Sequence, residues 1–203
     1  FITEACEYTN SFLSFFPKIS VILNIDADHL DFFKDLDDIR HSFREYARLV
    51  PDDGALIINS DIDNIEYFTE GLKCSVITVG SDPDKSMYSA ANITFDEFAR
   101  GSYDLVVNGE IKDHITLKVT GKHNIYNSLA SIAAAHFMGI SNEDIKTGLT
   151  AYEGTDRRFQ LKGKLGDITI IDDYAHHPDE IRATLSTAKH YPHNKLWVVF
   201  QPH

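Results

Sequence analysis

The chain has 203 residues, 43% hydrophobic and 25% charged, a composition typical of a folded protein with one large domain or one domain and part of another. Its formal net charge of −12 argues against a nucleic-acid partner, because an acidic surface repels phosphate. The apolar stretches are far shorter than a membrane span, and the two cysteines, Cys6 and Cys74, indicate a reducing compartment rather than a disulfide framework.

The first part of the chain alternates short apolar runs with helical patterns. Strands are predicted within residues 18–29, 55–59 and 74–80, and helices within residues 35–50 and 60–71. An alternation of strands and helices predicts a parallel sheet that is covered by helices.

The pattern changes in the middle of the chain. Residues 91–121 alternate apolar and polar side chains around an Asn-Gly pair, which predicts antiparallel strands joined by a tight hairpin. Two helices are then expected, the first ending at Gly139 and the second capped by Ser141.

The last part predicts a second, smaller unit. A hairpin is expected over residues 160–172, a helix from about His177 to His190, and a buried strand over residues 195–200. We therefore predict a domain boundary between residues 156 and 157. Both ends of the chain look like cuts through a larger protein. The predicted class is α/β, with a mainly parallel sheet flanked by helices and an antiparallel hairpin portion.

Acidic and histidine side chains follow the first predicted strand in the stretch NIDADHLD. Asp26, Asp28 and His29 stand where α/β sheets bind ligands, and carboxylate oxygens suit Mg²⁺. The alternative is a solvated loop that caps the next helix. Earlier, Glu4 and Glu7 are three residues apart and would share one helical face, or else lie on a solvated surface.

Two later stretches suit a nucleotide. In GKHNIYNSLA, Asn124 and Asn127 share one face of a helix, and an amide side chain can match the edge of a purine. The alternative makes Asn124 a helix cap and Asn127 a solvated side chain. In GTDRRFQ, Arg157 and Arg158 carry the planar fork that fits phosphate or carboxylate, or else form surface ion pairs.

The stretch DDYAHHPDE follows the predicted strand that ends near Ile171. Pro178 and the two acids after it suit the first turn of a helix. Tyr174, His176 and one of the aspartates have no such structural need, and by themselves they fit a metal site, a general base or a nucleotide contact.

Taken together, these stretches resemble the Mur ligase family, in family order and over essentially the whole chain. The resemblance implies the later part of a central ATPase domain at residues 1–156 and the start of a C-terminal Rossmann-like domain at residues 157–203. It also implies that the UDP-binding domain and the rest of the C-terminal domain lie outside this chain. The matching stretches are EACEYTNSF, NIDADHLDFF, GKHNIYNSLASIAAA, YEGTDRRFQ, IIDDYAHHPDEI and VVFQPH.

The resemblance also implies roles for individual residues, with ATP and Mg²⁺ as the cofactors. Mg²⁺ is expected at Glu4 and His29. The nucleotide is expected at His123, Asn124, Asn127, Arg158 and Asp173, with Arg158 as the phosphate contact; Glu4, His29 and Arg158 are the expected catalytic residues. The incoming amino acid is expected at Tyr174 and His176, with His177 either beside it or only beginning the helix.

Within the family, EACEY, DDYAHHP and FQPH most resemble the branch that joins L-alanine to UDP-N-acetylmuramate through an acyl phosphate in peptidoglycan synthesis. This resemblance implies a cytoplasmic location. The alternatives are the tripeptide ligase of cell-wall recycling, a non-catalytic interaction domain and a metal-dependent hydrolase built on DADH and DDYAHH. The sequence has no GxxGK(S/T) phosphate loop, so we expect the chain alone to be inactive in ligation.

Overall fold

The computed structural model describes residues 1–202, so the last residue of the FQPH stretch lies outside the described part. The strands are β1 Ile19–Ile22, β2 Ala55–Asn59, β3 Ser75–Val79, β4 Tyr88–Phe95, β5 Arg100–Val107, β6 Glu110–Thr120, β7 Gln160–Leu165 and β8 Ile168–Asp172. The helices are a 3₁₀-helix Tyr8–Ser14, α1 Leu36–Ala47, α2 Glu66–Thr69, α3 Lys122–Phe137, α4 Asn142–Ala151 and α5 Pro178–His190.

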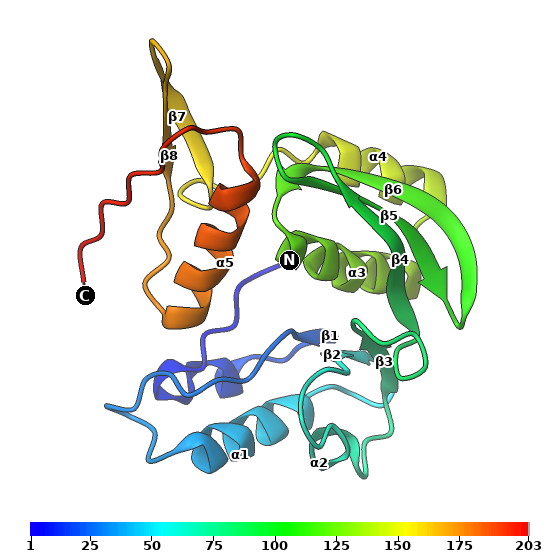
Figure 1. The fold of residues 1–203 in the computed structure, drawn as a ribbon. Helices are drawn as coiled ribbons and strands as arrows, with labels where there is room; N and C mark the ends of the chain where they lie inside the picture. The colour runs from blue at the N-terminus through cyan, green and yellow to red at the C-terminus, as the bar shows by residue number, and fades with distance from the viewer. Residues whose placement is uncertain (203) are drawn as a thin grey trace.

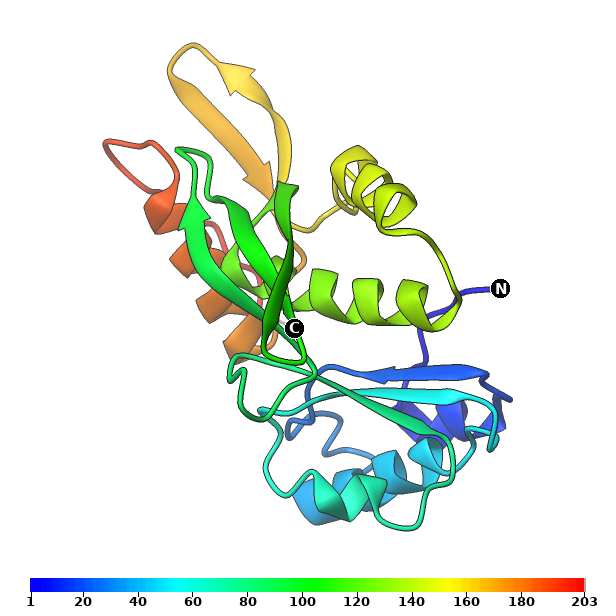
Figure 2. The ribbon, with the colours of Figure 1, turned by 90° about the vertical axis from the view of Figure 1, so that its right-hand side faces the viewer.

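A six-stranded sheet in the order β1-β2-β3-β4-β5-β6 forms the centre of the fold (Figure 1). Strands β1 to β4 pair in parallel, whereas β4 to β6 pair antiparallel. Strands β3 and β4 meet only where Val79 pairs with Tyr88, and Figure 2 shows the antiparallel strands leaving the parallel part there. The predicted α/β class, with its antiparallel portion, is confirmed.

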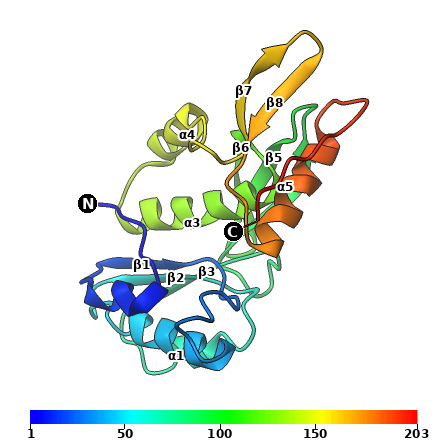
Figure 3. The same cartoon turned by 90° about the vertical axis from the view of Figure 1, so that its left-hand side faces the viewer.

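The two faces of β2 belong to two different cores. Ala55 and Ile57 pack with α3 and the antiparallel strands, whereas Leu56 and Ile58 pack with α1, α2 and the 3₁₀-helix. Figures 1 and 3 accordingly show α3 and α1 on opposite faces of the parallel strands. Burial on both faces explains why this strand is a continuous apolar run.

Capping groups fix most of the predicted helix boundaries. Asp35 accepts a hydrogen bond from the Asp38 amide at the start of α1, and Ser141 caps α4. His177 caps α5 in a capping box completed by the Glu180 carboxylate. None of the helices within residues 1–202 has the length and apolar character needed to cross a bilayer.

The helix predicted over residues 60–71 is wrong except for α2. The Asp61 carboxylate accepts hydrogen bonds from the amide and hydroxyl of Ser81, so it fastens the loop after β3 and does not cap a helix. Asn64 has a φ of 52°, which is incompatible with a continuing right-handed helix. Favourable helical spacing was therefore overridden by contacts distant in sequence.

The strand predicted over residues 195–200 is also wrong. Trp197 is 76% exposed and Val199 is 99% exposed, and this segment pairs with no strand in the described chain. A strand needs a neighbour to satisfy its backbone groups, so an apolar run alone does not form one. The other C-terminal elements, β7, β8 and α5, form as predicted (Figure 1).

The Tyr103 hydroxyl gives a test of the main core. It is fully buried and lies 2.6 Å from the Ser128 hydroxyl, which itself donates to the Ile125 carbonyl. Burial raises the pKa of Tyr103 to about 12, although the Ser128 hydrogen bond opposes this shift.

We expect Ser128→Ala to lower the free energy of unfolding by about 2 kcal/mol, because it leaves the buried tyrosine hydroxyl without its partner. Tyr103→Phe should cost about 1 kcal/mol, since Ser128 keeps its bond to Ile125. Urea unfolding of both variants measures the difference; equal losses, or a larger loss for Tyr103→Phe, would contradict this hydrogen-bond pattern.

Candidate functional site

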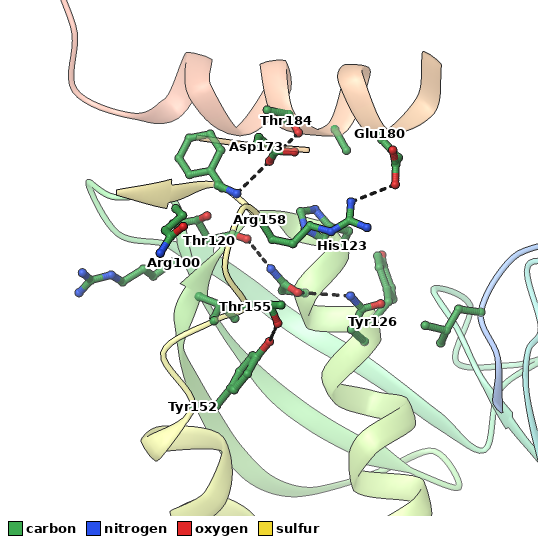
Figure 4. A pocket seen from close by; sticks show the side chains of 18 of the residues that line it. Arg100, Thr120, His123, Tyr126, Tyr152, Thr155, Arg158, Asp173, Glu180 and Thr184 are labelled. Atoms are coloured by element: carbon green, nitrogen blue, oxygen red, sulfur yellow. Dashed lines mark hydrogen bonds and ion pairs between the residues drawn. The ribbon is translucent and has the colours of Figure 1, made fainter. Parts of the chain in front are cut away.

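A pocket of about 990 Å³ lies where α3, the linker after α4 and α5 meet (Figure 4). Its lining combines residues that are distant in sequence. From α3 come His123, Asn124 and Asn127, from the linker Thr155, Asp156 and Arg158, and from the C-terminal elements Asp173, Glu180 and Thr184.

Gly121 allows α5 to come close to the start of α3. Its φ is 93°, and a Cβ atom there would lie 2.6 Å from the His123 ring and 2.8 Å from Thr187 Oγ1. A side chain at this position would therefore require the His123 ring and the Thr187 side chain to shift, and it would be strained by the positive φ.

The two asparagines of α3 are joined in a fixed orientation. Asn124 Nδ2 donates to the Thr120 carbonyl at 2.7 Å, and Asn127 Nδ2 donates to Asn124 Oδ1 at 3.2 Å. Since a carbonyl can only accept, it sets the orientation of both amides in turn. The N-cap of α3 is Gly121, so the alternative in which Asn124 caps the helix is wrong.

Asp173 ties the linker to the C-terminal elements. Its carboxylate accepts hydrogen bonds from the Phe159 amide at 2.9 Å, the Ala175 amide at 2.8 Å and the Thr184 hydroxyl at 3.0 Å. Figure 4 shows Asp173 between the linker and α5. The side chain expected to contact a nucleotide thus also holds the linker in place.

Arg158 stands between two residues with left-handed backbone conformations. Arg157 has a φ of 61° and Phe159 a φ of 47°, values that side-chain-bearing residues adopt only at an energetic cost. Between them, Arg158 Nη1 donates to Glu180 Oε1 at 3.0 Å (Figure 4). The carboxylate of Asp173 on the Phe159 amide helps to hold this conformation.

His123 lies among these charged groups. Desolvation lowers the pKa of its imidazole; the negative charge of Asp173 opposes this, and the positive charge of Arg158 adds to it. The ring is therefore neutral at pH 7, so it can lie beside a flat, uncharged group without bringing a positive charge.

The residues expected around the amino acid lie mostly outside the pocket lining. Of these three, only His177 lines the pocket. The Arg157 Cζ atom lies 4.3 Å from the centre of the Tyr174 ring, and the centres of the Tyr174 and His176 rings are 5.2 Å apart. His177 is also the N-cap of α5, which agrees with the alternative that this residue begins the helix.

The expected metal site is arranged around Glu7 more than around Glu4. His29 Nε2 lies 3.7 Å from Glu7 Oε1 and 3.9 Å from Asp28 Oδ2, and the Tyr8 ring lies 4.7 Å from the His29 ring. Glu4 is exposed and precedes the 3₁₀-helix, so the expected shared helical face is not formed.

Throughout residues 1–202, no group of three or more His, Cys, Asp or Glu side chains is placed to hold a metal ion. The pair formed by Glu7 and His29 still fits Mg²⁺, because this ion commonly takes one or two protein ligands and completes its shell with phosphate oxygens and water. The pairing was missed in the sequence because it depends on how the 3₁₀-helix approaches the loop after β1.

Comparison with known proteins gives two family matches. Residues 1–135 match the Mur ligase middle domain, and residues 157–203 match the glutamate ligase domain of Mur ligases. The chain is 63% identical over 203 residues to a UDP-N-acetylmuramate–L-alanine ligase of Lachnospira eligens, covering 100% of this chain and 44% of that protein.

Solved structures share the fold. The UDP-N-acetylmuramate–alanine ligase MurC of Thermotoga maritima matches with a TM-score of 0.75 and 29% identity, over 89% of this chain and 40% of that one. A MurF ligase of Thermotoga maritima in complex with ADP matches with a TM-score of 0.70 and 16% identity, over 87% of this chain and 40% of that one.

The His123 environment predicts opposite effects of two substitutions on one titration. Arg158→Gln should raise the pKa of His123, and Asp173→Asn should lower it further, because the first removes a positive charge and the second a negative one. Imidazole resonances followed by NMR against pH would measure both shifts. Shifts of the same sign would show that these charges do not control the ring.

Proposed function

Because the chain belongs to the Mur ligase family, we propose that it carries the nucleotide-facing part of an ATP-dependent ligase that joins L-alanine to UDP-N-acetylmuramate in peptidoglycan synthesis. The observation that carries the proposal is the pocket, which joins Asn127 of the stretch matching the middle domain to Arg158 and Asp173 of the stretch matching the C-terminal domain. The chain spans 44% of the length of the Lachnospira eligens ligase, so the complete reaction is proposed for the longer protein.

The asparagine pair supports recognition of adenine. With its Nδ2 directed to Asn124, Asn127 keeps its amide oxygen as an acceptor, which suits the exocyclic amine of adenine. His123, with its lowered pKa, would lie as a neutral ring beside the base. Asn124 would then act partly by orienting Asn127.

The linker and C-terminal elements would contact the rest of the nucleotide. Arg158 carries a guanidinium that fits phosphate oxygens, and Asp173 lines the same pocket near His123 as the proposed ribose or nucleotide contact. The loop between β8 and α5, with Tyr174, His176 and His177, would border the site of the incoming L-alanine. The first two would reach it only if this loop moves toward the pocket.

In the proposed reaction, the muramoyl carboxylate attacks the γ-phosphate of ATP and gives an acyl phosphate with release of ADP. The amine of L-alanine then attacks the acyl carbon, and inorganic phosphate leaves from the tetrahedral intermediate. The protein's part in such a transfer is mainly to position groups and to neutralise charge. Mg²⁺, proposed at His29 with Glu4 or Glu7, would supply charge neutralisation on the phosphates.

The hydrolase alternative has less support. The side chains of DADH divide between two places, because Asp26 lines the pocket while His29 faces Glu7. In DDYAHH, Asp173 is engaged by backbone amides and His177 caps a helix. These uses leave no compact hydrolytic metal centre within the described residues.

We expect the 203-residue chain to bind ADP more tightly than GDP, because Asn127 presents an acceptor that the 6-oxo group of guanine cannot satisfy. Asn127→Leu should remove this preference. Arg158→Gln should lower the affinity for ADP by about tenfold and leave the affinity for adenosine nearly unchanged. Isothermal titration calorimetry measures these affinities. A wild-type chain that binds GDP and ADP equally would contradict the proposed base site.

Ligation itself should need more than this chain. Since the sequence lacks GxxGK(S/T), we expect no phosphate release from ATP that depends on UDP-N-acetylmuramate and L-alanine. A coupled phosphate assay with Arg158→Gln as the blank would detect such release. Turnover above that blank would show that the phosphate loop is dispensable.

The proposed metal site predicts different effects of substitutions at Glu4 and Glu7. Because Glu7 faces His29, Glu7→Gln should weaken Mn²⁺ binding to the ADP-loaded chain more than Glu4→Gln does. Electron paramagnetic resonance of free Mn²⁺ during a titration gives both affinities. The reverse order would assign the metal to Glu4 instead.

A further inference from the structure

Glu180 divides its two carboxylate oxygens between two tasks. Oε1 accepts from Arg158 Nη1 at 3.0 Å, while Oε2 accepts from the amides of His176 at 3.1 Å and His177 at 3.4 Å. The second task completes the capping box of α5. Glu180 therefore caps α5 and also pairs with the Arg158 guanidinium, the group proposed to bind phosphate.

The hydrogen bonds to Glu180 outweigh its burial. Desolvation raises the pKa of this carboxyl, but the bonds from Arg158 and the two histidine amides reverse that effect and leave the pKa lowered. Glu180 is thus a carboxylate at neutral pH, and it neutralises the charge of Arg158 in this ion pair.

Other charges in the pocket make this neutralisation important. More carboxylates than cations line it: the acids are Asp26, Glu153, Asp156, Asp173, Asp179 and Glu180, and the bases are Arg100, Lys118 and Arg158. Lys118 lies 3.6 Å from Glu153 and is partly neutralised as well. An entering polyphosphate therefore meets a negative pocket whose central guanidinium already has a partner.

We propose that Glu180 is a built-in counter-ion that competes with nucleotide phosphate for Arg158. The competition makes Glu180 a specificity-determining residue, because this carboxylate lowers the affinity for phosphorylated ligands and leaves the affinity for the bare nucleoside unchanged. The inference rests on the proposed function, in which Arg158 contacts phosphate.

The geometry allows the exchange without loss of the fold. When Arg158 turns to a phosphate, Glu180 Oε2 keeps both amides of the helix cap. The freed Oε1 can be hydrated, because a third of the Glu180 side chain is exposed. The backbone on either side of Arg158 need not move, since Asp173 holds Phe159 and Gln160 holds the Arg157 amide.

Glu180→Gln tests the competition, because the amide oxygen can still serve the cap while the negative charge is gone. ADP should bind about fivefold more tightly to this variant than to the wild-type chain, the size expected for a partly exposed ion pair, and adenosine should bind equally to both. Titration calorimetry of both ligands gives the ratio.

Asp179→Asn is the matched control. Asp179 lies in the same helical turn and lines the same pocket, but its ion-pair partner is Arg182. It should change ADP binding by less than twofold. Glu180→Ala, which also removes the cap, should lower the melting temperature, whereas Glu180→Gln should nearly preserve it.

Several outcomes would overturn the inference: unchanged or weaker ADP binding by Glu180→Gln, an equal gain for adenosine, or an equal gain in Asp179→Asn. If Arg158→Gln weakens ADP while Glu180→Gln does not tighten it, only the counter-ion role fails. If Arg158→Gln leaves ADP binding unchanged, or if neither the wild-type chain nor Glu180→Gln binds ADP, the proposed nucleotide site fails together with it.

Discussion

The pocket depends on one carboxylate, that of Asp173. Its three hydrogen bonds join the linker, the loop after β8 and α5, which are brought together from residues far apart in sequence. Phe159, whose amide donates to Asp173, has the left-handed backbone conformation, so this bond helps to hold that conformation. The position of Arg158 is therefore held in part by this carboxylate, together with the Tyr174 amide that donates to the Arg157 carbonyl at 2.7 Å. The absence of a side chain at Gly121 leaves room for the His123 ring and for Thr187 of α5.

An acidic chain with a negative pocket is an unusual host for an anionic nucleotide. In the proposed site the contacts would be local: the oriented amide of Asn127 for the base and the Arg158 guanidinium for phosphate, with the neutral His123 imidazole between charged neighbours. Because Arg158 is paired with Glu180, the site presents little free positive charge to solvent. This suits selective binding better than a broad basic surface, which would attract any polyanion.

Much of the fold was predictable because local signals agreed with burial. The run Ala55–Asn59 forms the strand expected, and the Asn-Gly pair at residues 108–109 forms the hairpin, with φ values of 52° and 76°. In both failures, contacts outside the local sequence decided the structure. At residues 60–71 and 195–200, the local pattern was favourable, but distant hydrogen bonds or the lack of a pairing strand decided the structure.

The site was predictable only in part. The resemblance to Mur ligases pointed to Asn124, Asn127, Arg158 and Asp173, and the structure brings these four into one pocket. It could not show that Asn124 orients Asn127, that Glu7 faces His29, or that Glu180 pairs with Arg158, because these contacts depend on three-dimensional packing. In the sequence, Pro178 and the two acids after it indicated a helix start, but the capping box of His177 and Glu180 was not predicted, because its sequence signature begins with Ser, Thr, Asp or Asn.

In the proposed site, a nucleotide binds between α3 and α5 with its phosphate on Arg158. A crystal structure of the chain with ADP would show whether it does. We expect the adenine amine at Asn127 Oδ1, the phosphates at the Arg158 guanidinium, and Glu180 bound only to the amides of the α5 cap. ADP located elsewhere, or seated in the pocket with the Arg158–Glu180 pair intact and the phosphates pointing to solvent, would contradict it.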